Sequence, residues 1–264
     1  MKERILTAIC LLAVVIPLVY LGGYWFMGLI LIATGIATYE MLTMHDRENR
    51  IPLWIKGITF IGTLCVVLMP VFRMPAFYNA QFVSIGFVLA LLVVSAIRAK
   101  KGQEDISLYP LIIFYVGYSF RALVEIRNQS LTLFIFLIAT VILTDSMAYF
   151  AGRFFGKHKL VPKISPKKTV EGAIGGWLAG VVFAIGFGLR TELFAQMWVL
   201  IVLALLLPIL SQIGDLVASA LKRQHDIKDF GKIFPGHGGV MDRVDSQMLA
   251  AILIYMMILF GGLG

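Results

Sequence analysis

The chain has 264 residues, of which 59% are hydrophobic and 14% charged, and its mean hydropathy is +0.90. These values exclude an ordinary soluble domain and predict a protein of the lipid bilayer. The formal net charge of +8 is expected at the membrane surface, where anionic lipid headgroups are met.

Apolar runs of about 20 residues are needed to cross the hydrocarbon core of a bilayer. We predict nine such runs, centred near residues 5–21, 23–43, 52–71, 77–97, 106–125, 130–150, 171–189, 196–220 and 246–263. The first is interpreted as a retained helix, because no small-x-small cleavage site closes it. The expected fold is an all-α, polytopic integral membrane protein with about nine transmembrane helices.

Lysine and arginine are distributed very unevenly between the segments that join these runs. On one side of the membrane the segments hold only Arg73, Arg121, Arg127 and Arg190, and all the others fall on the opposite side. Positive residues favour the cytoplasmic side. We therefore expect a cytoplasmic N-terminus, in the cell (inner) membrane, with the active site facing the cytoplasm.

The polar chemistry lies in the second half of the chain. Residues 1–129 consist of apolar runs joined by short loops and are expected to be a transmembrane scaffold. Residues 130–264 are expected to be the catalytic region, because their cytoplasmic loops 151–170 and 221–245 are basic and rich in glycine and proline. No nucleic-acid partner is expected.

The seventh run carries small residues at every fourth position, namely Gly172, Gly176, Gly180, Ala184 and Gly188. Such a stripe lets another helix approach closely. Packing within the chain is favoured over a dimer seam, although the stripe leaves a homodimer open.

Ionisable residues inside apolar runs are costly and therefore suggest function. The candidates are Glu40, Arg121, Glu125, Asp145, Glu171 and Asp215. Four of them lie near the ends of runs, where an interfacial position explains them equally well; they are Glu40, Arg121, Glu125 and Glu171. Asp215 differs, because Ser219 and Lys222 follow at i+4 and i+7 on the same helical face.

The segment KIFPGHGGVMDRVDS, residues 232–246, combines a glycine turn with two carboxylates. Backbone N–H groups of Gly236, Gly238 and Gly239 could approach an anion, with His237 between them. Asp242 and Asp245 follow, and together with Asp215 they would offer oxygen ligands suited to magnesium or manganese. The alternative is that both carboxylates cap a helix and pair with Arg243 and Lys232.

A second basic segment precedes the glycine-striped run. It contains Lys163, Ser165, Lys167, Lys168 and Thr169, and hydroxyl and ammonium groups at a helix N-terminus can hold phosphate. Surface charge required for topology alone would also explain it. A P-loop is excluded, because no GxxxxGK[ST] motif occurs.

Residues 219–246, SALKRQHDIKDFGKIFPGHGGVMDRVDS, resemble the signature of the phosphatidate cytidylyltransferases, also called CDP-diacylglycerol synthases. The segments TDSMAYFAGRFFGKHKL and ISPKKTVEG resemble upstream blocks of that family. The chain departs from the family at Ala218, where glutamate is frequent, and at Asp226, where glycine is common. The resemblance covers residues from about 140 to 246, and the first half matches only as a series of apolar spans.

The resemblance implies that CTP and phosphatidic acid give CDP-diacylglycerol and pyrophosphate, with Mg²⁺ as cofactor, Mn²⁺ as a substitute and room for a second cation. It implies catalytic roles for Lys168, Asp215, Lys222, Asp242 and Asp245, with the three aspartates as metal ligands. It implies substrate binding by Asp145, Ser165, Lys167, Thr169, Ser219, Arg223, Lys228, Asp229, Gly236, His237, Gly238, Gly239 and Arg243.

Two alternatives share part of this chemistry. A CTP-dependent lipid kinase of the polyprenol type would also need basic loops, magnesium and a membrane-embedded acceptor. A transporter of an anionic solute could use the intramembrane acids as coupling sites, but the paired interrupted helices typical of that class are not found. A CDP-alcohol phosphotransferase is less favoured, because its spaced aspartate signature is missing.

Overall fold

The structure, a computed structural model, describes residues 2–46, 48, 50–68, 80–100, 106, 108–236 and 238–260. Each predicted apolar run overlaps a helical segment. In chain order these are α1 (Lys2–Leu21), α2 (Gly23–His45), α3 (Leu53–Leu68), α4 (Ala80–Lys100), α5 (Leu108–Ile112), the π-helical stretch η3 (Ile113–Tyr118), α6 (Ser119–Gln129), α7 (Leu131–Phe155), α8 (Val170–Thr191), α9 (Met197–Gln224) and α10 (Met241–Leu259).

The chain divides into two compact units. Unit 1 contains Met1–Val124 and Asp229–Asp242, and unit 2 contains Glu125–Lys228 and Arg243–Gly264. Residues 229–242, which contain the glycine turn, therefore pack with the first half of the chain. The expected functional division at residue 129 stays a prediction, because the units describe packing.

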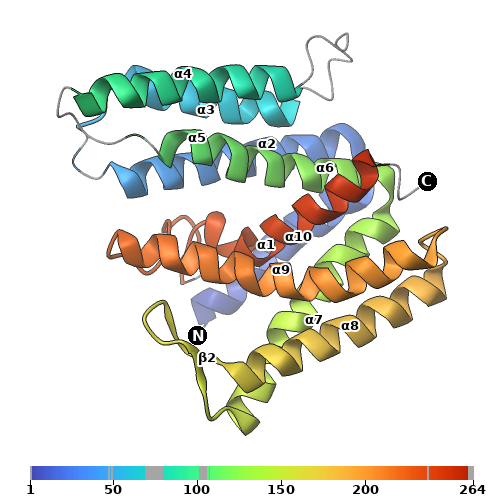
Figure 1. The fold of residues 1–264 in the computed structure, drawn as a ribbon. Coiled ribbons are helices and arrows are strands. Elements are labelled where there is room, and N and C mark those ends of the chain that lie inside the picture. The colour runs from blue at the N-terminus through green and yellow to red at the C-terminus, as the bar shows by residue number, and fades with distance from the viewer. Residues whose placement is uncertain are drawn as a thin grey trace. The chain divides into compact units, whose positions relative to one another are not determined.

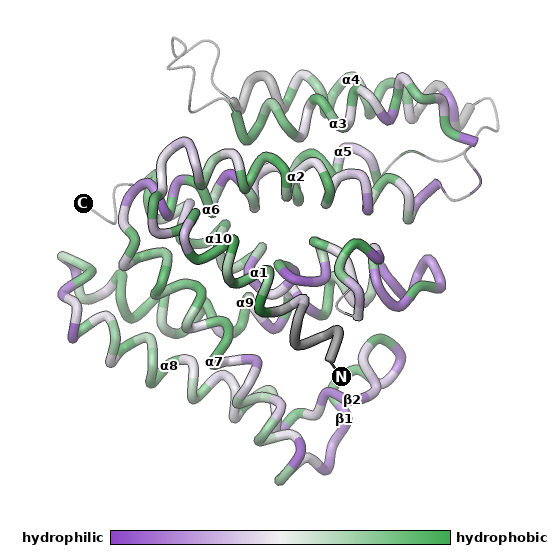
Figure 2. The backbone as a smooth tube through the Cα atoms, turned by 180° about the vertical axis from the view of Figure 1, so that it is seen from behind, coloured by the Kyte–Doolittle hydropathy of each residue, from purple (hydrophilic) through white to green (hydrophobic). Residues whose placement is uncertain are grey.

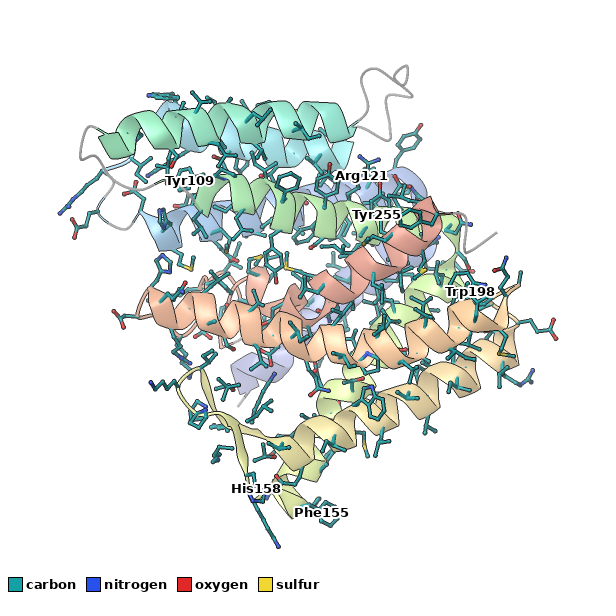
Figure 3. All side chains as sticks on the ribbon, in the orientation of Figure 1. Tyr109, Arg121, Phe155, His158, Trp198 and Tyr255 are labelled. Atoms are coloured by element: carbon teal, nitrogen blue, oxygen red, sulfur yellow. The ribbon has the colours of Figure 1, made fainter. Side chains whose placement is uncertain are left out.

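Unit 1 is a helical bundle around α2 and α3. Helix α3 packs against α2, α4 and η3, as Figure 1 shows for α3 and α4, which run side by side. Large apolar side chains such as Phe26, Met41, Ile55 and Phe120 are almost fully buried there. Arg121, labelled with Tyr109 in Figure 3, donates to the carbonyl oxygen of Val66 at 3.4 Å.

Unit 2 is built on close packing of α8 against α7 and α9 (Figure 1). All five small residues of the α8 stripe are buried. A Cβ atom on Gly176 would lie 2.6 Å from the Ala148 methyl group, and one on Gly180 would lie 2.7 Å from Cγ of Pro208. These neighbours belong to α7 and α9, so the prediction that the stripe serves packing within the chain is confirmed.

A small antiparallel hairpin joins α7 to α8. Its strands are β1 (Lys159–Val161) and β2 (Ser165–Thr169), with Lys159 opposite Thr169 and Val161 opposite Ser165. Figure 2 shows the hairpin largely in hydrophilic colours beside the hydrophobic α8. The sequence predicted a basic loop rich in glycine and proline over residues 151–170, whereas α7 continues to Phe155 and the hairpin follows.

The described helices support the predicted membrane fold. Five segments are long and apolar enough to cross a bilayer, namely Gly23–His45, Leu108–Gln129, Leu131–Phe155, Val170–Thr191 and Met197–Gln224. Within unit 2, Trp198 lies at the opposite end from Phe155 and His158 (Figure 3), and tryptophan favours membrane interfaces. The chain is an all-α polytopic membrane protein, whereas the number of nine crossings and the cytoplasmic N-terminus stay predictions.

Candidate active site

Two elements of unit 2 bring Lys168 and Asp215 together. Nζ of Lys168, on β2, lies 2.5 Å from Oδ2 of Asp215, on α9. The hydroxyl of Ser219 donates to Oδ1 of the same carboxylate at 3.4 Å, as expected for residues one helical turn apart. Between a quarter and a third of each charged side chain is exposed. The pair is therefore open to a ligand.

A second ion pair joins α9 to α10. Nζ of Lys222 lies 3.9 Å from Oδ2 of Asp245, and both side chains are largely buried. Gly214 allows the two helices to meet, because a Cβ atom there would lie 2.6 Å from the carbonyl oxygen of Asp245. This ion pair holds the ammonium group of α9 against α10.

Asp145, on α7, completes the charged cluster of unit 2. Its side chain bonds with that of Ser246, which is buried on α10, and it interacts electrostatically with Asp215 and Lys168. The cluster, defined here as Asp145, Lys168, Asp215, Ser219, Lys222, Asp245 and Ser246, thus draws on α7, β2, α9 and α10. It places three carboxylates and two ammonium groups within one compact unit.

The hairpin that presents Lys168 is fixed at its base. Thr169 is the buried N-cap of α8, and its hydroxyl accepts a hydrogen bond from the N–H of Gly172 at 3.1 Å. Glu171 accepts bonds from the N–H groups of Lys157 and His158, and one of its oxygens lies 2.6 Å from Nδ1 of His158. The sequence left a functional and an interfacial position open for Glu171, and in the structure it closes the hairpin.

Arg223 ties the hairpin turn to the segment that follows α9. Its Nη1 donates to the carbonyl oxygen of Ile227 at 2.9 Å, and its Nε donates to that of Ile164 at 3.5 Å. The chain leaves α9 through Asp226, whose φ is +51°. The N–H of Asp226 donates to Arg223 and that of Ile227 to Lys222, the paired bonds of a Schellman ending.

The glycine turn lies in unit 1 and bends through residues with positive φ. The φ angles are +75° at Gly236 and +82° at Gly238, a region that glycine enters without steric cost. The N–H of Phe234 donates to the carbonyl oxygen of Gly238 at 3.0 Å. His237 lies outside the described residues.

Asp242 holds this turn from the first turn of α10. Its Oδ2 accepts hydrogen bonds from the N–H groups of Phe230 at 2.8 Å and Gly239 at 3.0 Å. Donation of the Gly239 N–H to a substrate anion, as the sequence suggested, would require that bond to break. The carboxylate thus has a local structural role, and its role as a metal ligand stays a prediction.

Glu40, on α2, is a residue that the sequence did not place in the site. It is 5% exposed, and its Oε1 and Oε2 accept bonds from the N–H groups of Val240 and Met241, each at 3.0 Å. Two features of the sequence could have indicated its role: Glu40 is an acidic residue in an apolar run, and glycines stand at positions 231 and 239. A Cβ atom on either glycine would overlap the Glu40 carboxylate.

The other predicted substrate-binding residues lie at the surface of their units. Ser165 is half-buried at the start of β2, and Lys167, Lys228, Asp229 and Arg243 are exposed. Their roles stay predictions. So does the meeting of Asp242 with Asp215 and Asp245 around one cation, because Asp242 belongs to unit 1 and the other two to unit 2.

The chemistry of the unit 2 cluster fits a hard cation. Its donors are carboxylate and hydroxyl oxygens, which suit magnesium, and it contains no thiol. In the described part of the chain, no group of three or more His, Cys, Asp or Glu side chains is already arranged around a cation position.

Comparison with known proteins extends the resemblance to the whole chain. A model described as "Cytidylyltransferase family" matches residues 2–260. The chain belongs to the cytidylyltransferase family. The first half, which resembled only a series of spans, is therefore part of the cytidylyltransferase fold as well.

Several curated relatives share one name. "Phosphatidate cytidylyltransferase" of Bacillus subtilis (strain 168) is 35% identical over 98% of this chain and 97% of its own. Proteins of the same name from Staphylococcus saprophyticus and Staphylococcus epidermidis are each 34% identical, over 98% of this chain and 99% of theirs.

Proposed function

We propose that this member of the cytidylyltransferase family transfers a cytidylyl group from CTP to phosphatidic acid, giving CDP-diacylglycerol and pyrophosphate for phospholipid biosynthesis. The observation that carries the proposal is similarity along nearly the full length of relatives named phosphatidate cytidylyltransferase. The charged cluster of unit 2 supports it, because the reaction brings two highly charged phosphate compounds together.

The reaction demands alignment more than proton transfer. A phosphate oxygen of phosphatidate forms a bond to the α-phosphorus of CTP, and the bond from that phosphorus to the β-phosphate oxygen breaks. The nucleophile is already an anion, so no strong general base is required. Catalysis then consists of holding both anions in line and neutralising the charge that accumulates between them.

The two lysines of the cluster supply that neutralisation. Lys222 is 8% exposed, so its interaction with phosphate is weakly screened by water. Lys168 is more open and can receive the lipid phosphate or the departing pyrophosphate. Asp215 and Asp245 hold these ammonium groups in place before the substrates bind.

Magnesium is the proposed cofactor. Asp215, Asp242 and Asp245 would hold it, and Asp145 is placed to assist a second cation; Mn²⁺ is the expected substitute. When bound, the ion neutralises the triphosphate and polarises the phosphoryl group under attack. Alignment of the lipid phosphate still falls to the protein's own lysines and hydroxyls.

The proposed location is the cytoplasmic (inner) membrane of a bacterial cell, with the active site facing the cytoplasm, where CTP is available. The apolar helices and the bacterial relatives support a membrane protein. The bias of lysine and arginine to one side supports the orientation.

The deciding experiment follows the phosphorus atoms of CTP. Purified protein in detergent is incubated with phosphatidic acid, Mg²⁺ and CTP labelled at either the α- or the γ-phosphate. We expect α-label in the lipid and γ-label in pyrophosphate. Transfer of γ-label to the lipid would instead identify a lipid kinase, and no transfer of either label would contradict both enzymes.

A further inference from the structure

Glu40 has a structural relationship that neither the family signature nor the proposed chemistry assigns. Helix α10 begins at Met241, and the residue before it, Val240, has no side-chain oxygen to accept from the first free N–H groups of the helix. Such groups normally bond to a nearby capping side chain. Here the acceptor is a carboxylate on α2, 200 residues earlier in the chain.

The Glu40 carboxylate is enclosed by hydrogen bonds from α10 and by the loop that precedes it. Its two oxygens take the N–H groups of Val240 and Met241. On the loop side, Gly231 lies so close that a Cβ atom there would come within 2.7 Å of Cδ of Glu40. Burial of a charged group is costly unless its hydrogen-bonding capacity is satisfied. Glu40 is only 5% exposed, so its carboxylate tolerates little displacement from these contacts.

The loop between Gly231 and Met241 is also held by a second carboxylate, that of Asp242. Glu40 fixes the N–H groups at 240 and 241, while Asp242 takes those of Phe230 and Gly239. The bonded N–H groups of residues 239, 240 and 241 follow one another directly along the chain. A displacement of the Glu40 carboxylate must therefore move the backbone that orients Asp242.

We propose that Glu40 is a positioning residue for cytidylyl transfer, which acts by fixing the glycine turn and the first turn of α10, and hence the orientation of Asp242. The inference rests on the proposed function. Glu40 itself touches neither substrate. Its contribution is to hold a catalytic carboxylate to within the fraction of an ångström that alignment requires.

The test compares Glu40→Gln and Glu40→Asp with Glu48→Gln, a control at an exposed carboxylate just beyond α2. Glutamine keeps the shape but turns an amide N–H₂ toward one N–H donor, and aspartate keeps the charge but is shorter by one methylene. We expect kcat of Glu40→Gln to fall about a hundredfold with the KM for phosphatidate unchanged. Glu40→Asp should recover part of the loss, and Glu48→Gln should match the wild type.

A second pair of variants approaches the same contact from the loop. Gly231→Ala places a methyl group against the Glu40 carboxylate and should reproduce the fall in kcat. Its control is Gly28→Ala on α2, where no described atom lies within 4 Å of the added carbon. This pair keeps the proposal testable even if Glu40→Gln does not fold.

Hydrogen exchange supplies a readout independent of turnover. The amides of Val240 and Met241 should exchange about tenfold faster in Glu40→Gln than in the wild type, because their acceptor is weakened. Faster exchange with unchanged kcat would reduce Glu40 to a helix cap, and unchanged exchange would remove it from the turn; either result overturns the proposal. If the wild type transfers no cytidylyl group, the proposed function fails, and the exchange data still decide whether Glu40 holds the loop.

Discussion

The ammonium group of Lys168 lies 2.5 Å from Oδ2 of Asp215, so an ion pair joins the β1–β2 hairpin to α9. Partly exposed ion pairs contribute only about 0.2–1 kcal/mol. The cost of separating this pair is therefore small compared with the energy of binding a multiply charged phosphate. Lys168 can transfer from the carboxylate to a substrate without a large barrier.

Replacement of Lys168 should remove the ammonium group that moves from Asp215 to the substrate phosphate. We expect Lys168→Ala to lower the rate of cytidylyl transfer on the order of a hundredfold, the loss typical when one charge-stabilising group is removed. The measurement is incorporation of α-labelled CTP into lipid. Lys159→Ala, an exposed lysine on the same hairpin, is the matched control and should retain wild-type turnover.

The carboxylate of Asp215 can be tested separately. Asp215→Asn keeps the size of the side chain but removes the charge that holds Lys168 and that would bind magnesium. We expect most turnover to be lost while the protein still inserts and folds, as judged by its elution in detergent. An Asp215→Asn protein with full activity would exclude Asp215 from the metal site.

The oxygen donors of the cluster predict that the enzyme depends on magnesium. Removal of divalent cations with a chelator should abolish transfer, and Mg²⁺ or Mn²⁺ should restore it, whereas Zn²⁺ should not. The assay is again the α-label in lipid, with each cation titrated separately. Transfer that persists in chelator would contradict the proposed cofactor.

The end of α9 offers a test of local stability. Asp226 occupies the left-handed position of a Schellman ending, with φ of +51°, where a non-glycine residue costs about 1–2 kcal/mol. Asp226→Gly removes this strain and should raise the free energy of unfolding by about 0.5–1 kcal/mol. The gain is smaller than the strain itself, because glycine also has more freedom to lose in the unfolded chain. Thermal unfolding in detergent measures the change, and Asp226→Ala should show no gain.

In α8, alanine substitution should have different effects at a glycine inside the small-residue stripe and at one outside it. Gly180→Ala should destabilise unit 2 by about 1–3 kcal/mol, because the new methyl group would overlap Pro208 and Thr144, and overpacking of a tight contact has that cost. At Gly186 no described atom lies within 4 Å of an added Cβ. Gly186→Ala should therefore be neutral or slightly stabilising, and equal losses in both variants would contradict the packing.

Much of the fold could be predicted because bilayer-spanning helices follow from long apolar runs alone. The run at 23–43 became α2, and the small residues from Gly172 to Gly188 marked the face of α8 that packs within the chain. The hairpin could not be predicted in this way. Strand β1 has three residues and β2 is largely polar, so neither shows the alternation that identifies a strand.

The site was predicted best where its residues are close in sequence. Asp215, Ser219 and Lys222 share a helical face by spacing, whereas the contact of Asp215 with Lys168 depends on how the hairpin folds back. Glu40 could be noticed as an acid in an apolar run, but its donors lie at residues 240 and 241. Only tertiary packing connects those positions, and no local periodicity encodes it.

The long-range bond of Glu40 also bears on the order of assembly. Synthesis proceeds from the N-terminus, so α2 enters the membrane well before Val240 and Met241 leave the ribosome. Until then the carboxylate must stay hydrated or borrow other donors, since a dry, unpaired charge is prohibitively costly. Closure of this contact is consequently a late event in biogenesis, and it coincides with the formation of α10.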